Sequence, residues 1–486
     1  HRVTANRAHW HLEPRSGSME DTEPKLKLKR EVGLMGAVSL IAGTMIGSGI
    51  FMTPQTVLGS IGSTGASLVV WASCGLLVIL ASFCYAELGT MITESGGEYI
   101  YILRTSGSVV AFMLVFSSVL FVRPAGIAGM GLGFAQYVVA PFYSDCPPPV
   151  VVVKCVAAAA IVTLAIVNCI NVRLAMSVQV FFTVAKVLAL TVIIIGGIVT
   201  LIQGHTENFD DSFRNTNVGI NPIGIAFYQG LWSYDGWNNL NYVTEELKRP
   251  EVNLPRALII AISLVTGLYL LVNVSYLTVM TPRELMSSSA VAVTWGNKVL
   301  GSWGWIMSLA AALSAFGSLN GTFFSGGRVC FVAAREGHMP GILAMAHVHR
   351  LTPSPALIFS TIISLVVLIP GDFQSIVNYF SFTAWFFYAI TVSGLLYLKI
   401  KKPELPRSYR VPFVLPVLVI LAAIFLVLAP IIDKPQIEFL YVTLFILSGA
   451  LLYIPFIHYK LCPGLLTKLT LFLQLMLEVA PAEKNL

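Results

Sequence analysis

Long apolar segments separated by short polar loops dominate the pattern of this chain. A helix of roughly 20 apolar residues crosses a bilayer. Segments of about that length fall at 33–58, 66–93, 107–140, 155–172, 177–203, 220–245, 257–280, 303–327, 355–370, 375–398, 411–432 and 437–458. The pattern predicts an all-α membrane protein with twelve transmembrane helices, an even number that places both termini on one side.

The composition excludes a soluble protein. Of the 486 residues, 56% are hydrophobic and 11% are charged, whereas a soluble domain carries about 25% charged residues. The formal net charge of +6 does not indicate a nucleic-acid partner, because the basic residues are spread between the apolar segments rather than clustered. The expected surroundings of the chain are therefore a lipid bilayer.

Basic residues in the loops set the orientation. The loops on one side hold 20 Lys and Arg residues, and those on the other side hold five, namely Lys154, Arg214, Arg283, Lys298 and Lys434. Cytoplasmic loops carry such an excess, so we expect both termini in the cytoplasm, as tails over 1–31 and 459–486. Residues 1–18 read as vector or untranslated sequence ahead of Met19, and we expect them to be non-native.

The sixth apolar segment contains a carboxylate next to a glycine, in the run from Trp232 to Trp237. A charge at bilayer depth costs roughly 2.5–3.5 kcal/mol on insertion scales. Gly236 weakens the helix and frees its backbone. We expect a broken helix at the centre of a transporter here, with Asp235 recognising positive charge on the substrate.

The first apolar segment has a second weak point, the run Gly47-Ser48-Gly49. If the helix is unwound there, the N–H groups that start the second half carry the positive end of its dipole and suit a carboxylate. The free carbonyl groups that end the first half suit an ammonium group. Close helix packing through small residues explains the glycines equally well when this segment is considered alone.

The spacing of the two weak points favours the functional explanation. About 187 residues and five apolar segments separate Ser48 from Asp235. Interrupted helices at corresponding positions of two halves indicate an inverted-repeat transporter with a binding site at the membrane midplane. We expect a first repeat of five spans over 32–203, a second repeat over 220–398, and two additional spans over 411–458.

Polar residues also lie inside other apolar segments. Lys186 is about ten residues into the fifth segment, where it either snorkels to the interface or replaces a sodium ion that bridges the first half-helix to the core. The second reading makes transport independent of sodium. Arg123 in the third segment either lines the pathway or pairs with a carboxylate. Ser318, with Asn320 and Thr322, either forms hydrogen bonds between helices or contacts the substrate.

Cys146 lies in a short outside loop between Tyr143 and Pro148. That compartment is oxidising, and no second outside cysteine is evident, so we expect an intermolecular disulfide, with a free or buried thiol as the alternative. The sequence shows no metal-ligand cluster, P-loop, nucleophile elbow or carboxylate pair. We therefore expect no metal, no cofactor and no enzymatic activity.

Five short motifs resemble a known family, namely Gly47–Phe51, Gly96–Tyr99, Val243–Glu246, Asn253–Pro255 and Arg335–His338. From about Glu31 to the C-terminus, the chain resembles the light subunits of heteromeric amino acid transporters, in the amino acid–polyamine–organocation superfamily. The resemblance implies the LeuT-like fold, with helices 1 and 6 unwound. With aspartate at 235, the chain is most similar to the b(0,+)-type subunits, which take up cystine and dibasic amino acids in exchange for neutral ones.

The resemblance also implies the site residues. Substrate contacts are implied for Thr44, Ile46, Gly47, Ser48, Gly49, Phe227, Trp232 and Asp235, and we add Ser318 as a candidate contact from its place in the eighth segment. The backbone around Ser48 would hold the substrate carboxylate. The substrate amine would be framed by Ile46, Phe227 and the carbonyl groups near Thr44 and Trp232. Trp232 would close over the bound side chain, Asp235 would favour lysine, arginine and the distal ammonium of cystine, and Lys186 would occupy the position of a sodium site.

A partner is implied in the same way. Cys146 would bond a single-span heavy-subunit glycoprotein of the rBAT type, in the plasma membrane and on the apical side of epithelia. The tail departs from the family, because the usual Val-Pro-Pro stretch is replaced by Val479-Ala480-Pro481-Ala482. This difference puts trafficking that depends on the tail in doubt.

These observations predict a sodium-independent exchanger that imports cystine, lysine, arginine and ornithine against neutral amino acids by alternating access. A neutral-amino-acid-only exchanger or a cystine-selective exchanger of the same family is the alternative. A sodium-coupled symporter would need oxygen ligands where Lys186 lies. A scaffold or receptor that does not transport would show no uptake in liposomes.

Overall fold

The computed structural model describes residues 26–27, 30–143, 148–288, 290–339, 345–347, 352–371, 373–405, 409–432, 436–454 and 463–483. The helices of the first half are α2 (Leu34–Met45), α3 (Gly49–Met52), α4 (Pro54–Ile61), α5 (Thr64–Met91), α6 (Glu98–Thr105), α7 (Ser108–Ser117), α8 (Arg123–Val139), α9 (Val150–Ile170) and α10 (Val172–Ile202). A π-helical segment, η2 (Ser118–Val122), joins α7 to α8.

The second half begins with α11 (Ile220–Ser233), followed by a 3-10 segment, η5 (Asn239–Glu246). Its further helices are α12 (Pro250–Val279), α13 (Pro282–Ser287), α14 (Val291–Val299), α15 (Trp305–Arg335), α16 (Ser354–Leu368), α17 (Phe373–Lys401), α18 (Val414–Ile432), α19 (Ile437–Tyr453) and α20 (Pro463–Leu477). Short 3-10 turns lie at Ala140–Phe142, Glu207–Phe209 and Gly301–Trp303.

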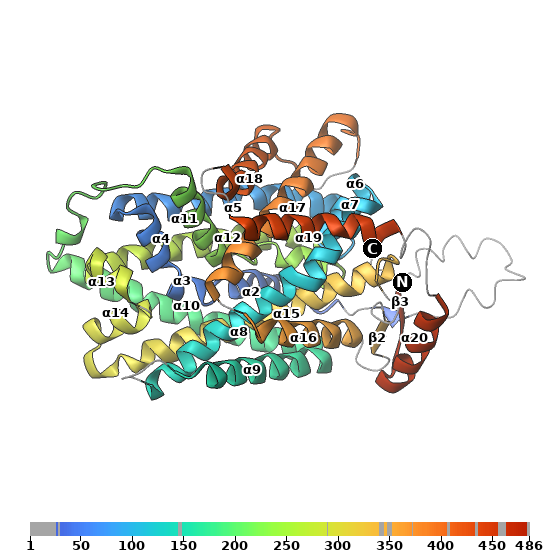
Figure 1. The fold of residues 1–486 in the computed structure, drawn as a ribbon, viewed down its shortest axis with the longest axis horizontal. Coiled ribbons are helices and arrows are strands. Elements are labelled where there is room, and N and C mark those ends of the chain that lie inside the picture. Colours follow the sequence, from blue (N-terminus) through green and yellow to red (C-terminus); the bar gives the residue numbers. More distant parts are fainter. Residues whose placement is uncertain are drawn as a thin grey trace, which may run out of the picture.

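Most helices run along one direction, as Figure 1 shows, with α13 and α14 at one end of the bundle and α20 at the other. Nine helical stretches of the described chain are long and apolar enough to cross a membrane. The helices α16 and α19 are apolar but shorter, and α11 has 14 residues. The prediction of a helical protein with many membrane spans is therefore confirmed.

Two details differ from the sequence-based expectation. The helix α15 continues to Arg335, so Arg328 lies inside a helix and is buried, where we expected a loop. Its charge is neutralised by Glu246 of η5, which explains how a helix can carry it. The chain is also not entirely α-helical, because a small sheet forms at the end of the bundle that carries α20.

The three strands of this sheet come from distant parts of the chain. They are β1 (Leu26–Lys27), β2 (Met345–His347) and β3 (Val479–Glu483). The central strand β3 pairs in parallel with β1 and antiparallel with β2. Strands this short leave little hydrophobic alternation in the sequence, and the sheet connects both tails to the segment between α15 and α16.

Candidate functional site

The first helix of the bundle is interrupted where the sequence predicted a weak point. The helix α2 ends at Met45, and α3 begins at Gly49. A Cβ atom at Gly47 would lie 2.7 Å from the hydroxyl oxygen of Ser318, and a Cβ atom at Gly49 would lie 2.7 Å from the Cα atom of Ser233. The glycines are therefore needed for close approach as well as being weak helix formers.

Lys186 of α10 caps the end of α2. Its Nζ atom donates to the carbonyl oxygens of Gly43, at 2.5 Å, and Ile46, at 2.6 Å. Its side chain is buried, with 1% of its surface exposed. An ammonium group in this position satisfies carbonyl groups that the end of a helix leaves without intrahelical donors. The lysine points into the bundle, so the snorkelling alternative does not apply.

Serine hydroxyls of α15 also donate to carbonyl groups of this interruption. The hydroxyl of Ser318 in α15 donates to the carbonyl oxygen of Thr44 at 2.5 Å, and that of Ser314 donates to Ile46 at 3.1 Å. Ser318 therefore contacts the helix end directly, and its hydroxyl hydrogen is used within the protein. Of the two readings of Ser318, hydrogen bonding between helices is the one that the structure displays.

The second interruption follows α11, which ends at Ser233. Residues 234–238 form turns, and Gly236 has a φ of +99°, a left-handed conformation that favours glycine. A Cβ atom there would lie 2.6 Å from the Cγ2 atom of Thr44. The chain then continues as the 3-10 segment η5 rather than as a second α-helical half.

The two interruptions are in direct contact. The Tyr269 hydroxyl of α12 lies 2.6 Å from the carbonyl oxygen of Met45 and 2.6 Å from that of Ser233. The hydroxyl groups of Thr53 and Ser233 are 2.7 Å apart. These contacts, together with those of Gly49 and Gly236, place the end of α2 and the end of α11 at one point of the bundle.

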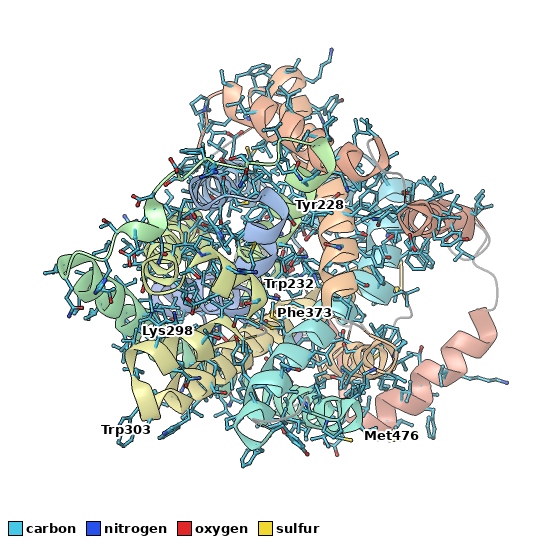
Figure 2. All side chains as sticks on the ribbon, turned by 60° about the vertical axis from the view of Figure 1, so that its left-hand side comes forward. Tyr228, Trp232, Lys298, Trp303, Phe373 and Met476 are labelled. Atoms are coloured by element: carbon cyan, nitrogen blue, oxygen red, sulfur yellow. The ribbon has the colours of Figure 1, made fainter. Side chains whose placement is uncertain are left out.

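Trp232 lies one residue before the end of α11 and is buried. Its ring packs edge-to-face on Phe380 of α17, with centroids 5.0 Å apart, and on Phe373, with centroids 6.0 Å apart. Figure 2 shows Trp232 and Phe373 next to each other near the middle of the bundle. The indole Nε1 atom is buried and has no hydrogen-bond partner in the described chain.

Asp235 lies at the second interruption and is half-buried. The hydroxyl of Tyr388 in α17 is 3.5 Å from its Oδ1 atom. The charges of Arg123 and Glu98 are close enough to act on its carboxylate. Asp235 therefore does not stand alone, because one cation and a second anion of the chain lie around it.

Arg123 belongs to a buried polar cluster. Its Nη2 atom donates to the hydroxyl of Tyr242, and its guanidinium lies 4.4 Å from the centre of the Tyr242 ring. The Tyr242 hydroxyl donates to one carboxylate oxygen of Glu98, and the Asn238 amide donates to the other. The sequence left two interpretations of Arg123 open, and in the structure Arg123 contacts the phenol of Tyr242 directly and interacts with the carboxylates of Glu98 and Asp235 through charge.

Sequence reasoning did not assign a role to Glu98. It begins α6, a short helix that is not among the stretches long and apolar enough to span a membrane. The signal was the motif Gly96–Tyr99, which we used only as a mark of resemblance. Gly97 has a φ of +55°, and a Cβ atom there would lie 2.7 Å from the Tyr242 ring. The glycine thus allows Glu98 to reach the cluster.

The remaining predicted residues take different positions. The hydroxyl of Ser48 is buried without a partner in the described chain and faces Gly133 of α8. Phe227 precedes the end of α11 by six residues, which is about 9 Å along a helix, so it stands apart from the contact between the interruptions. Cys146 lies outside the described residues.

Comparison with known proteins relates nearly the whole chain to amino acid transporters. Residues 32–454 match the family described as amino acid permease. The human b(0,+)-type amino acid transporter 1 is 50% identical over 471 residues, which are 96% of this chain and 97% of that protein. The human cystine/glutamate transporter is 39% identical over 480 residues, 96% of this chain and 95% of that protein.

A third human relative, the large neutral amino acids transporter small subunit 2, is 43% identical over 413 residues, 84% of this chain and 77% of that protein. All these relatives are transporters, and none is an enzyme, as the sequence motifs predict. The chain therefore belongs to the amino acid permease family, in the group of the light subunits of heteromeric amino acid transporters, and is a multi-pass membrane protein that transports amino acids.

Proposed function

We propose that this chain is a sodium-independent exchanger that imports cystine and cationic amino acids against neutral amino acids. The observation that carries the proposal is the contact between the two interruptions, with Lys186 at the first and Asp235 at the second. The relatives named for b(0,+)-type transport support it. Lysine, arginine and ornithine are the cationic substrates that this charge pattern suits.

The proposed membrane topology has twelve spans. It adds to the nine long apolar stretches the shorter apolar helices α16 and α19, and α11, which lies between the spans α10 and α12. The helices from α2 to α10 would form the first repeat of a LeuT-like fold, and those from α11 to α17 the second, inverted repeat. The loop charges then place both termini in the cytoplasm, at the end of the bundle that carries α20.

The backbone of an amino acid would bind at the first interruption. The N–H group of Ser48 has no acceptor in the described chain, and those of Gly49 and Ile50 precede the first hydrogen bond of α3, which runs from Phe51 to the Ser48 carbonyl. The Ser48 hydroxyl is also unpartnered there. These donors suit a carboxylate. A carbonyl oxygen has two lone pairs, so that of Thr44, which accepts from the Ser318 hydroxyl, still has room for an ammonium group.

Lys186 provides the argument for independence of sodium. Its ammonium group bonds two carbonyl oxygens three residues apart, those of Gly43 and Ile46, as a bound sodium ion would. A covalently fixed cation needs no ion gradient to occupy the site. Alternating access would come from rocking α2, α5, α11 and α12 against the rest of the bundle, with substrate needed to close the site.

Asp235 provides the argument for cationic substrates. Exchanging an external cation for an internal neutral amino acid moves one charge inward, which is favoured by about 2.3 kcal/mol per 100 mV. Reduction of cystine inside the cell would keep its inward gradient steep. The nearby charge of Arg123 supports a second candidate, a neutral-only or cystine-selective exchanger, because it offsets the charge of Asp235.

The proposed assembly is a heterodimer with a single-span heavy-subunit glycoprotein of the rBAT type. Cys146 would form the disulfide, in the plasma membrane and on the apical side of epithelia. One relative is named as a small subunit, the large neutral amino acids transporter small subunit 2, which supports a partner for this chain too. Cys146→Ser should abolish a covalent heterodimer on a non-reducing gel, whereas Cys155→Ser, an exposed cysteine of α9, should not.

The experiment that tests the transport proposal uses purified protein in proteoliposomes loaded with unlabelled leucine. Entry of labelled arginine, cystine and leucine is compared in sodium and in choline buffers. The proposal expects all three to enter at the same rate in both buffers, and little entry into empty liposomes. Entry of leucine alone would favour the neutral-only candidate, and a requirement for sodium would contradict the role given to Lys186.

A further inference from the structure

We propose that Glu98 is a second carboxylate that determines specificity, leaving one uncompensated negative charge beside Asp235 for the cation of a substrate side chain. The inference rests on the proposed transport of cationic amino acids. It assigns a task to a residue that the transport argument does not use. Glu98 would act on the substrate through Asp235 and through charge, as a positioning residue rather than by direct contact.

The first step is that Glu98 is bound to the stretch that follows Asp235. Its side chain is buried, and its two carboxylate oxygens accept hydrogen bonds from Asn238 and Tyr242. Both donors lie within seven residues of Asp235 along the chain. Glu98 itself lies about 140 residues away in sequence. A movement of the second interruption therefore moves the partners of Glu98.

The second step is the charge of the cluster. Its carboxylates are Asp235 and Glu98, and its cation is the guanidinium of Arg123. The other groups that face it are the neutral phenols of Tyr85 in α5, Tyr242 in η5 and Tyr388 in α17. Two negative charges and one positive charge leave a formal charge of −1. A buried charge without a partner is costly.

The third step is that one cationic side chain would bring the cluster to neutrality. A substrate with an uncharged side chain would leave the charge uncompensated. Opposite charges attract over several ångströms in a medium of low dielectric constant. Glu98 therefore strengthens the preference for cationic side chains that Asp235 creates, and Arg123 weakens it.

The size of the cavity explains why contact is not expected. The space between Glu98, Arg123, Tyr242 and Tyr388 measures about 20 Å³. A single water needs about 10–15 Å³, so a lysine or arginine side chain does not fit there. In this conformation, the substrate would meet Asp235, and Glu98 would remain behind it.

The formal charge of the cluster predicts how strongly each variant prefers arginine over leucine. Glu98→Gln gives the cluster a charge of 0, and Arg123→Gln gives it a charge of −2. The double variant Glu98→Gln with Arg123→Gln returns it to −1. A role that is only structural predicts that the double variant is at least as impaired as either single variant, because more hydrogen bonds are lost.

The test measures counterflow of labelled arginine and labelled leucine in proteoliposomes. Glu98→Gln should weaken the apparent affinity for arginine by at least about tenfold relative to leucine. The double variant Glu98→Gln with Arg123→Gln should recover most of the wild-type preference for arginine over leucine. Glu98→Asp, which keeps the charge, should retain it even if overall exchange slows. Glu94→Gln is the matched control, because its partner Arg104 lies outside the cluster.

Each result decides the question. An unchanged ratio of arginine to leucine in Glu98→Gln would overturn the role of Glu98 while leaving the proposed exchange intact. Equal loss of both substrates without recovery in the double variant would also overturn it. A wild-type protein that exchanges leucine but not arginine would overturn the proposed transport of cations itself. Elution of each variant as a single species in detergent separates lost function from lost folding.

Discussion

The Nζ atom of Lys186 lies 2.6 Å from the carbonyl oxygen of Ile46, at the point where α2 ends. This contact fixes one charge at the first interruption, inside the bundle. A helix that stops in mid-bundle leaves carbonyl groups without donors, and each unsatisfied buried group costs about 1–3 kcal/mol. The lysine therefore serves the stability of the broken helix, and in the proposed mechanism it also serves transport.

Replacement of this lysine is the first prediction. Lys186→Met should reduce exchange of arginine and leucine together by at least about tenfold, because the carbonyl of Gly43 loses its side-chain donor, at a cost of about 1–3 kcal/mol, while that of Ile46 keeps only Ser314. The measurement is counterflow in proteoliposomes. Lys154→Met is the control, since that lysine of α9 bonds the carbonyl of Ile369 and donates to neither interruption in the described chain. Equal rates for Lys186→Met and wild type would contradict the assignment.

The hydroxyl of Tyr269 gives the second prediction. It lies within hydrogen-bond distance of both interruptions, although it has one hydrogen to donate. Tyr269→Phe should slow arginine and leucine exchange to the same extent, by about tenfold for a loss of about 1.4 kcal/mol. Tyr276→Phe, on the same helix, should have a smaller effect, because its hydroxyl lies 3.4 Å from the carbonyl of Ile50. A change in substrate preference would not fit this role.

The third prediction concerns the ion pair between Arg328 and Glu246. Its atoms are 2.7 Å apart, and the side chains are 1% and 0% exposed. Removal of one partner of a buried pair costs about 3–5 kcal/mol, so Arg328→Met should clearly lower the melting temperature in detergent. The double variant with Glu246→Gln should recover part of the loss. Lys298→Met breaks an exposed pair with Glu284 and should cost less than about 1 kcal/mol. Equal losses of stability in Arg328→Met and Lys298→Met would argue against this account.

The fourth prediction concerns pH. Burial raises the pKa of Glu98 above that of an ordinary glutamate. As the pH falls, Glu98 therefore takes up a proton earlier than an exposed glutamate would, and the cluster loses the negative charge that attracts cations. Between about pH 7 and about pH 5, arginine exchange should fall relative to leucine exchange. Glu98→Gln should show a flatter ratio over that interval. A rise in arginine exchange relative to leucine exchange on acidification would contradict this prediction.

The sequence predicted the interruptions because their cause is local. Glycines at mid-membrane weaken a helix wherever they occur, and Asp235 next to Gly236 is visible without any knowledge of neighbours. The contact of Lys186 with α2 was inferable for the same reason, because a deep lysine needs a partner. The resemblance then supplied roles that no local pattern contains.

What the sequence did not predict depends on distant contacts. Glu98 and Arg328 each find partners more than 80 residues away, so their charges read as loop charges in a linear pattern. Phe227 stays a prediction, because the resemblance named the residue but not its distance from the end of α11. The three-stranded sheet joins both tails to the segment between α15 and α16, and no periodic pattern in the sequence predicts this pairing.

The central claim is that a carboxylate at the second interruption selects cationic cargo for the site shared with the first. The most direct measurement is counterflow of labelled arginine and leucine by wild type and Asp235→Asn, reconstituted in parallel without sodium. The account predicts that Asp235→Asn loses arginine exchange by at least about tenfold, or about 1.4 kcal/mol, and keeps leucine exchange. Retention of the wild-type ratio of arginine to leucine by Asp235→Asn would contradict it.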